Sequence, residues 1–252
     1  RQGTTSDLAT LEEVLLMMPT PKVSVLTCSH DRPTLLRVAI ESLHAQTDQD
    51  WEHLIYDDAS TDKKVDETLR WATEDPRVRV WRRTNNLDRP SVLWNFMLDR
   101  ARGHYLTILD DDNEKLPQFI EIMAEALDAN LALGFVTCGW IVIHLDGSWE
   151  RDCHYNLETC ESNLAKKSTC EGCSVMFRRD ALDRAGYFSE ALRTNEDWDW
   201  MRRAAATSNF VNLSQCLTKY RNHDANRMFR RKELGNDTDE VQVLLRNVAW
   251  RS

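Results

Sequence analysis

The stretch HYLTILDDDN, residues 104–113, decides the fold. Its apolar residues predict a buried strand, and three consecutive carboxylates follow where that strand ends. Carboxylates at such a position are costly unless a cation or hydrogen-bond donors meet them, and three adjacent ones repel one another. Their oxygen atoms suit Mg²⁺ or Mn²⁺, which takes further ligands from substrate phosphates. The stretch therefore predicts a metal site for a nucleoside diphosphate compound, at the end of a strand where open α/β sheets bind ligands. A solvated acidic turn is the alternative.

The composition is that of an ordinary globular protein. The chain has 252 residues, of which 42% are hydrophobic and 29% charged, and its net charge is −9. An acidic chain is a poor partner for nucleic acid, which favours basic surfaces. We find no signal peptide, and no apolar run reaches the roughly 18 residues that span a bilayer. We expect no transmembrane segment and a cytoplasmic location, with peripheral attachment to a membrane left open.

Strands and helices alternate around the acidic run. Strands are expected at 23–27, 53–56, 78–81 and 104–109. Helices are expected after Asp31, which we expect to cap the first one, and at 66–73, 91–102 and 117–130. This order predicts a mostly parallel, Rossmann-like α/β sheet flanked by helices in a single domain.

The rest of the chain is less regular. We expect two strands within 134–145, a polar loop over 146–170, a strand at 174–177, helices at 180–185 and 196–207, and a strand within 210–220. The predicted division is a leader at 1–20, one domain at 21–230 and a helical tail at 231–252. The domain would have a nucleotide-binding half at 21–115 and an acceptor half at 116–230.

Seven cysteines are scattered along the chain, and four of them fall within residues 153–173. Only Cys170 and Cys173 have spacing typical of zinc ligands, with His154 as a further candidate ligand. Free thiols in a reducing compartment are the expectation, with a zinc site left open.

Several spaced motifs together resemble the family 2 glycosyltransferases, which have the GT-A fold, and the small SpsA-like members in particular. The resemblance covers roughly residues 22–226. It rests on the segments TCSHDRP (27–33), DDASTD (57–62), LDDD (109–112), CSVMFRR (173–179), GYF (186–188) and NEDW (195–198). It implies an inverting enzyme with a DXD motif that uses Mn²⁺ or Mg²⁺. Such an enzyme moves one sugar from a nucleotide diphosphate sugar, with a UDP-sugar expected, to an acceptor hydroxyl.

The resemblance implies roles for residues around the donor. Asp58 resembles the residue that binds the base, and His30 lies where a side chain packs on it, close to Thr27 and Cys28. Arg89 is expected near the pyrophosphate. Asp111 resembles the carboxylate that binds the ribose. For the metal, Asp112 resembles the direct ligand, Asp110 is a second candidate, and His223 resembles a late histidine that contacts metal or phosphate.

On the acceptor side, Asp197 resembles the general base, and Glu171 and Trp198 are expected to face the acceptor. The acceptor itself could be a saccharide, a lipid-linked compound, a peptide or a small molecule. Acidic residues in a first helical turn also favour the helix dipole, so a capping role for Asp197 is the alternative. Two other functions stay open: a nucleotidyltransferase, although residues 28–33 lack the glycines that cradle a triphosphate, and a non-catalytic binding module of the same fold.

Overall fold

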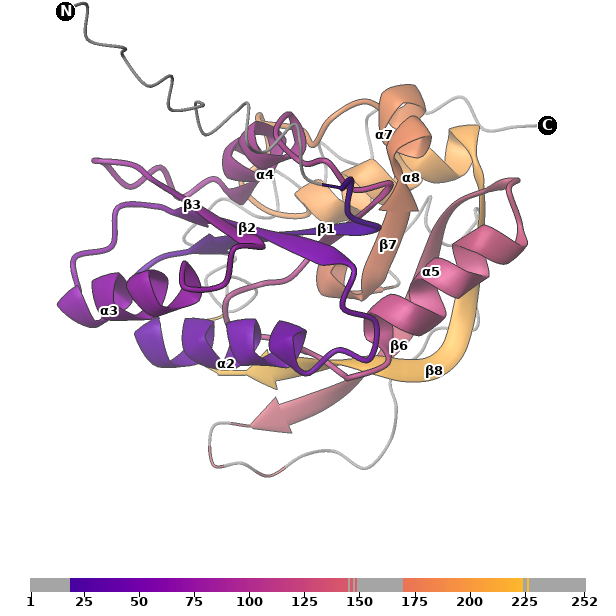
Figure 1. Cartoon of the computed structure of the whole chain (residues 1–252). Coiled ribbons are helices and arrows are strands. Elements are labelled where there is room, and N and C mark those ends of the chain that lie inside the picture. Colours follow the sequence, from indigo (N-terminus) through magenta and orange to yellow (C-terminus); the bar gives the residue numbers. More distant parts are fainter. Residues whose placement is uncertain (1–18, 145, 147, 149–169, 224–225, 227–252) are drawn as a thin grey trace, which may run out of the picture.

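The chain folds around a single eight-stranded sheet flanked by helices (Figure 1). The computed structural model describes residues 19–144, 146, 148, 170–223 and 226. The strand order is β3-β2-β1-β4-β7-β6-β8-β5. The predicted tail and all but the last two residues of the predicted leader lie outside the described residues, as does most of the predicted polar loop.

The first half of the chain forms the parallel part of the sheet, as predicted. Strand β1 pairs in parallel with β2 and β4, and β2 pairs in parallel with β3. The strands are β1 (Val23–Ser29), β2 (Trp51–Asp57), β3 (Val78–Arg82) and β4 (Tyr105–Ile108). The helices are α2 (Pro33–His44), α3 (Lys63–Ala72) and α4 (Pro90–Leu98).

The second half adds mostly antiparallel strands. Strand β7 pairs antiparallel with both β4 and β6, whereas β6 and β8 run parallel and β5 closes the edge antiparallel to β8. The strands are β5 (Glu114–Lys115), β6 (Leu133–His144), β7 (Val175–Arg178) and β8 (Asn209–Asn222). The helices are α5 (Phe119–Ala129), the 3₁₀ turn η1 (Gly172–Ser174), α7 (Arg179–Ala185) and α8 (Glu196–Thr207).

The prediction of two strands and a turn within 134–145 is wrong. The segment is one strand whose pairing with β8 shifts register between Thr137 and Gly139 and again between Gly139 and Trp140. A glycine inside a strand pattern marks a bulge as readily as a turn. The neighbouring strand β8 is long enough to pair on both sides of the irregularity, so the chain continues instead of reversing.

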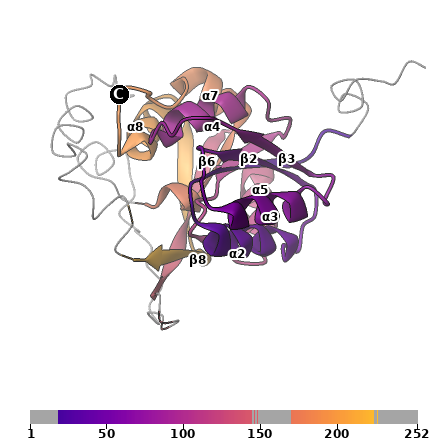
Figure 2. The same cartoon turned by 90° about the vertical axis from the view of Figure 1, so that its left-hand side faces the viewer.

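Helices cover both faces of the sheet. In two perpendicular views, α2, α3 and α5 lie on one face, and α4, α7 and α8 lie on the other (Figure 2). The buried clusters follow these layers. One contains Met97 of α4 with Trp200 of α8, another contains Leu43 of α2 with Met123 of α5, and a third joins α2 to Val65 of α3. Since both faces are covered, ligands can reach the sheet only at its strand ends.

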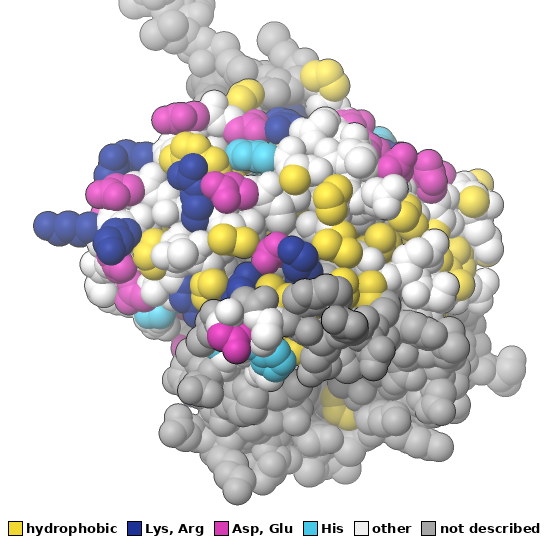
Figure 3. Space-filling model, turned by 90° about the horizontal axis from the view of Figure 1, so that it is seen from below, with side chains coloured by type: hydrophobic (Ala, Val, Ile, Leu, Met, Phe, Trp, Pro, Cys, Tyr) yellow, Lys and Arg dark blue, Asp and Glu magenta, His cyan; other side chains and the backbone are white. Residues whose placement is uncertain are grey.

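Charges on the outer surface are mixed in sign. On the face seen from below, acidic and basic side chains are interspersed over the described residues (Figure 3). The acids of the run at 110–112 differ because Asp111 and Asp112 are buried, at 5% and 9% exposed. Among the described helices, none combines the length and the apolar character needed to cross a bilayer.

Candidate active site

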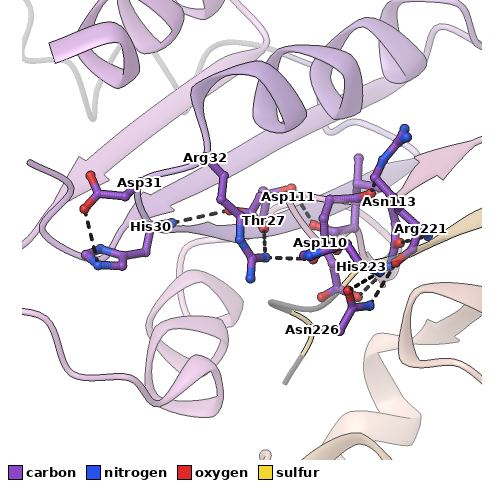
Figure 4. Close-up of polar contacts among 12 residues, drawn as sticks. Thr27, His30, Asp31, Arg32, Asp110, Asp111, Asn113, Arg221, His223 and Asn226 are labelled. Atoms are coloured by element: carbon purple, nitrogen blue, oxygen red, sulfur yellow. Dashed lines mark hydrogen bonds and ion pairs between the residues drawn. The ribbon is translucent and has the colours of Figure 1, made fainter. Parts of the chain in front are cut away.

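The acidic run lies where the parallel strands end. Strand β4 stops at Ile108, and the backbone N–H of Leu109 still donates to Leu26 of β1. The chain then turns, with the N–H of Asn113 donating to the carbonyl of Asp110. This turn points Asp111 toward Arg32 in the loop between β1 and α2 (Figure 4), and Asp112 contacts the same arginine. Two carboxylates from the decisive stretch thus face a loop that is about 80 residues earlier in the chain.

A single guanidinium bridges these two carboxylates. Nη1 of Arg32 lies 2.9 Å from Oδ1 of Asp111 and 2.7 Å from Oδ2 of Asp112. Arg32 is the residue before the first turn of α2, and Pro33 follows at the start of the helix. Arg32 belongs to the segment TCSHDRP, but nothing in the local sequence pattern predicts that it pairs with the acidic run. The signal for it is charge balance, because buried carboxylates need a cation.

The edge strands bring further groups to Asp112. Nε2 of His223 lies 3.1 Å from Oδ2 of Asp112, so the structure joins these two predicted metal-site residues across the whole domain. Arg221 fixes the turn from the other side: its Nε donates to the carbonyl oxygen of Asp112 at 3.2 Å, and its Nη2 lies 2.8 Å from Oε1 of Glu114. Pairing of β5 with β8 therefore sets the geometry of the acidic turn.

The chemistry of these side chains suits a divalent cation. Nη1 of Arg32 contacts two carboxylate oxygens, and one of these, Oδ2 of Asp112, also lies 3.1 Å from the imidazole nitrogen of His223, so a positive charge already lies between the two carboxylates. Carboxylates and imidazole are ligands that Mn²⁺ and Mg²⁺ accept, with phosphate oxygens completing the set. Among the described residues, no three His, Cys, Asp or Glu side chains are assembled as a ready metal cage. The ligand atoms are thus of the kind that a divalent cation binds, and Arg32 lies between the two carboxylates.

Asp110 has a different environment from its two neighbours. Its Oδ2 accepts a hydrogen bond from Nδ2 of Asn113 at 3.1 Å. Burial raises the pKa of Asp110 to about 8, with further contributions from Asp112 and Asp111. Burial also raises the pKa of Asp111, to about 6, against the opposing effect of Arg32. Asp110 therefore retains its proton at neutral pH.

Asp197 reaches the same region from the start of α8. Asn195 precedes the helix with a left-handed backbone, φ 59°. Asp197 lies against Gly172, where an added Cβ would be 2.8 Å from Oδ2 of Asp197. Burial, together with the charges of Asp197 and Asp112, raises the pKa of Glu171 to about 7. The predicted base, the predicted acceptor residue and the acidic run thus share one electrostatic environment.

Asp58 holds a backbone turn. Its Oδ1 accepts from the N–H of Leu87 at 3.0 Å, and its Oδ2 accepts from the N–H of Asp88, also at 3.0 Å. Asp88 adopts a left-handed backbone, φ 50°, which this pair of hydrogen bonds supports. Arg89 follows, and its Nη1 donates to the carbonyl of Glu190 at 2.6 Å. The structure therefore gives Arg89 a partner in the acceptor half, whereas the sequence predicted a pyrophosphate contact.

The loop after β1 is built around Asp31, but Asp31 does not cap α2. Its Oδ1 accepts from the N–H of Thr61 and, at 2.9 Å, from the N–H of Asp62, so it organises the loop that leads into α3. The expectation that Asp31 caps the first helix is wrong, because its left-handed backbone, φ 51°, turns the side chain toward the neighbouring loop. His30 donates its backbone N–H to Oδ2 of Asp111 at 3.3 Å. Its half-exposed ring lies beside Asp31.

Two other predicted contacts are not supported. Thr27 is buried, and its hydroxyl donates to the carbonyl of Leu109 at 2.8 Å and lies 2.8 Å from Nε2 of His53, so it is used within the sheet. Trp198 is 1% exposed and belongs to the core cluster with Trp200, so its ring is not available for stacking on an acceptor sugar. Cys28 is partly exposed near the site, and burial of its thiol raises its pKa.

The described cysteines do not form a zinc site. The thiol of Cys170 lies 3.1 Å from the sulfur of Met201, whereas the sulfur of Cys173 accepts from Nδ2 of Asn113 at 3.6 Å. The two side chains thus have separate surroundings. Cys216 is disulfide-bonded, so the expectation of free thiols throughout is wrong at that position. Cys153, His154 and Cys160 lie outside the described residues.

Comparison with known proteins identifies the family of the chain. The model of the family described as Glycosyl transferase family 2 matches residues 24–186. The chain is 28% identical over 207 residues to TuaG of Bacillus subtilis, provisionally named a teichuronic acid biosynthesis glycosyltransferase, covering 80% of this chain and 79% of TuaG. It is 28% identical to the GalNAc(5)-diNAcBac-PP-undecaprenol beta-1,3-glucosyltransferase of Campylobacter jejuni, and the match covers 72% of this chain and 59% of that enzyme. The uncharacterized protein y4gI of Sinorhizobium fredii is 30% identical over 68% of this chain, which spans only 19% of y4gI.

Two solved structures share the fold. TarS of S. aureus in complex with UDP-GlcNAc has a TM-score of 0.67 at 19% identity, covering 82% of this chain and 60% of TarS. The mannosyltransferase PcManGT of Pyrobaculum calidifontis, in complex with GDP-Man and Mn²⁺, has a TM-score of 0.70 at 17% identity, covering 91% and 65%. At these identities the likeness establishes the GT-A fold.

Proposed function

The chain belongs to glycosyl transferase family 2, and on that basis we propose that it is an inverting, metal-dependent enzyme that transfers one sugar from a nucleotide diphosphate sugar to an acceptor hydroxyl. The observation that carries the proposal is the pairing of Asp112 with His223 beyond the end of β4, where the charges of Asp112 and Asp197 both raise the pKa of the buried Glu171. A buried cluster of acids that repel one another is retained where chemistry needs it.

The donor is proposed to bind along the ends of β1, β2 and β4. Both oxygens of Asp58 accept from the turn at Leu87 and Asp88, so an N–H of the base would use a remaining lone pair of the same carboxylate. Uracil presents such a group, and so does guanine. The solved structures of the same fold contain UDP-GlcNAc or GDP-Man, so both nucleotides belong in the test, and we propose UDP as the first candidate.

Asp197 is proposed to act as the general base. The helix dipole favours a carboxylate at the first turn of α8, and Asp197 would accept the proton of the acceptor hydroxyl as that oxygen attacks the anomeric carbon. Attack opposite to the leaving diphosphate inverts the configuration. Asp112 and His223 would hold the divalent cation, which when bound stabilises negative charge on the leaving diphosphate. Asp111, which the resemblance assigns to the ribose, offers a second carboxylate oxygen beside Arg32, whereas Asp110, the other candidate ligand, accepts a hydrogen bond from Asn113.

The acceptor is proposed to enter from the side of Glu171 and Gly172. Acceptor-side loops vary around a fixed scaffold, so the fold does not name the acceptor. The Campylobacter jejuni relative is named for an undecaprenol-linked substrate, which makes lipid-linked saccharides one class to test beside free saccharides. An acceptor of that class would place the protein at a membrane surface.

The experiment is a donor screen that follows nucleoside diphosphate release. UDP- and GDP-sugars are incubated with the protein and Mn²⁺, with EDTA, and with the Asp112→Asn variant. Release from one donor that requires Mn²⁺ and is lost in the variant supports the proposal. If no donor is turned over, and no nucleotide with Mn²⁺ shifts the thermal midpoint, a non-catalytic module becomes the better account. Nucleotidyl transfer would instead release pyrophosphate from nucleoside triphosphates.

A further inference from the structure

We propose that Arg32 is an internal cation that holds the metal-site carboxylates until a divalent ion replaces it. The inference rests on the proposed metal dependence, and it concerns Arg32, for which the sequence predicts no role. Its basis is the position of Nη1 of Arg32, which lies within 2.9 Å of one oxygen of Asp111 and one oxygen of Asp112. A metal ion that used both of these oxygens would need the place that this nitrogen occupies.

The surroundings of the bridge explain why a cation is needed there. The Asp111 and Asp112 side chains are 6% and 11% exposed, so water screens their mutual repulsion poorly. The side chain of Arg32 is more exposed than either carboxylate, at 27%, and it stands just before α2. Of the three side chains, that of Arg32 is thus the one best placed to turn toward solvent.

The third metal-site residue supports the same assignment. Nε2 of His223 lies 3.1 Å from Oδ2 of Asp112, the same oxygen that Arg32 contacts. One oxygen of Asp112 therefore contacts both His223, the other proposed metal ligand, and the positively charged Arg32. Replacement of the guanidinium by a divalent ion would preserve this arrangement and add the charge that a diphosphate requires.

Arg221 provides a matched control, because it lies beside the same residue without occupying its carboxylate. Its Nε contacts the backbone carbonyl of Asp112, and Lys219 lies 2.8 Å from Oε2 of Glu114, which is the partner of Arg221. Loss of the Arg221 side chain removes the same charge, while the backbone N–H of residue 221 still donates to Oδ1 of Asn113 at 2.9 Å and keeps β8 attached to the acidic turn. The comparison separates occupation of the site from general electrostatic repulsion of a metal.

The test measures Mn²⁺ affinity by electron paramagnetic resonance and thermal midpoints by calorimetry, both without nucleotide. We expect Arg32→Met to bind Mn²⁺ at least about tenfold more tightly than wild type, and Arg221→Met to differ less than about threefold. In EDTA, Arg32→Met should melt roughly 5 °C or more below wild type, and Mn²⁺ should restore most of the difference. Arg32→Lys keeps the positive charge but has a single donor nitrogen. Its Mn²⁺ affinity and its melting temperature in EDTA should lie between those of wild type and Arg32→Met, and it replaces Arg32→Met in the test if that variant does not fold.

The possible failures are distinguishable. If wild type binds Mn²⁺ together with UDP but neither Arg32 variant binds it more tightly, the competition is wrong and the proposed metal dependence stands. If Arg221→Met tightens binding as much as Arg32→Met, repulsion explains the effect and the inference is overturned. If no variant binds Mn²⁺ with or without nucleotide, both the inference and the proposed metal dependence fail.

Discussion

Gly172 lies so close to Asp197 that a Cβ at position 172 would approach Oδ2 of Asp197 to 2.8 Å. The glycine belongs to the 3₁₀ turn before β7, and the carboxylate belongs to the first turn of α8. The side chain of one element is therefore held by the backbone of the other. Oδ1 of Asp197 accepts from the backbone N–H of Trp198 at 2.8 Å, and Gly172 limits the space around Oδ2, so the two contacts together set the direction of the proposed base.

Gly172→Ala should displace Asp197 without touching the metal site. A displacement of about 1 Å at a reacting group can cost about a hundredfold in rate. We expect donor turnover to fall about tenfold to a hundredfold while nucleotide affinity stays within about twofold of wild type. Steady-state turnover and calorimetric titration with nucleotide measure the two quantities. Unchanged turnover would show that the contact does not direct the carboxylate.

Asp58→Ala should lower stability even when no nucleotide is present. The change leaves the N–H groups of Leu87 and Asp88 without their acceptor, which costs about 1–3 kcal/mol for buried groups and less where water can enter. Urea denaturation in nucleotide-free buffer measures the loss. Asp58→Asn keeps one acceptor oxygen and should recover part of it. Equal stability of all three proteins would mean that the turn is held by other contacts.

Stability should fall below about pH 6.5 because of His53. Burial lowers the pKa of His53 to about 3. Between pH 6.5 and 3 the unfolded chain binds a proton at this histidine and the folded chain does not. The free energy of unfolding therefore decreases as the pH falls, by up to roughly 1.4 kcal/mol per pH unit.

The measurement that checks this dependence is urea denaturation at several pH values for wild type and His53→Gln. The glutamine retains an amide that can meet Thr27, the partner of His53, but cannot titrate. We expect a shallower decline for His53→Gln between pH 6.5 and 4. His104→Gln, at an exposed histidine, is the control and should follow wild type. Parallel curves for wild type and His53→Gln would contradict the assignment.

The sequence predicted the parts of the molecule that follow local rules. Alternation of apolar strands and amphipathic helices predicted the parallel half, and the acids at the end of β4 predicted a ligand site there. The pairing of Asp112 with His223 was anticipated only through the family resemblance. Local patterns carry no information about which distant loop meets a strand end.

The remaining features depend on tertiary contacts. Arg32 bridges Asp111 and Asp112 because two loops distant in sequence meet, and no spacing rule indicates such a partner. Trp198 looks like a sugar-stacking residue beside an acidic motif, but the turn of α8 directs it into the core. A glycine such as Gly139 is compatible with either a bulge or a turn, and only the pairing of β6 with β8 shows that it lies at a bulge.

The most direct test of the account is the turnover of a bound donor by Asp197→Asn. With the donor found in the screen and Mn²⁺ present, we expect release of the nucleoside diphosphate to fall at least about a hundredfold, as for loss of a general base. The affinity for the donor should stay within about twofold, because Asp197 is assigned to the acceptor hydroxyl and not to the nucleotide. Wild-type turnover in a folded Asp197→Asn protein would contradict the account and require another base.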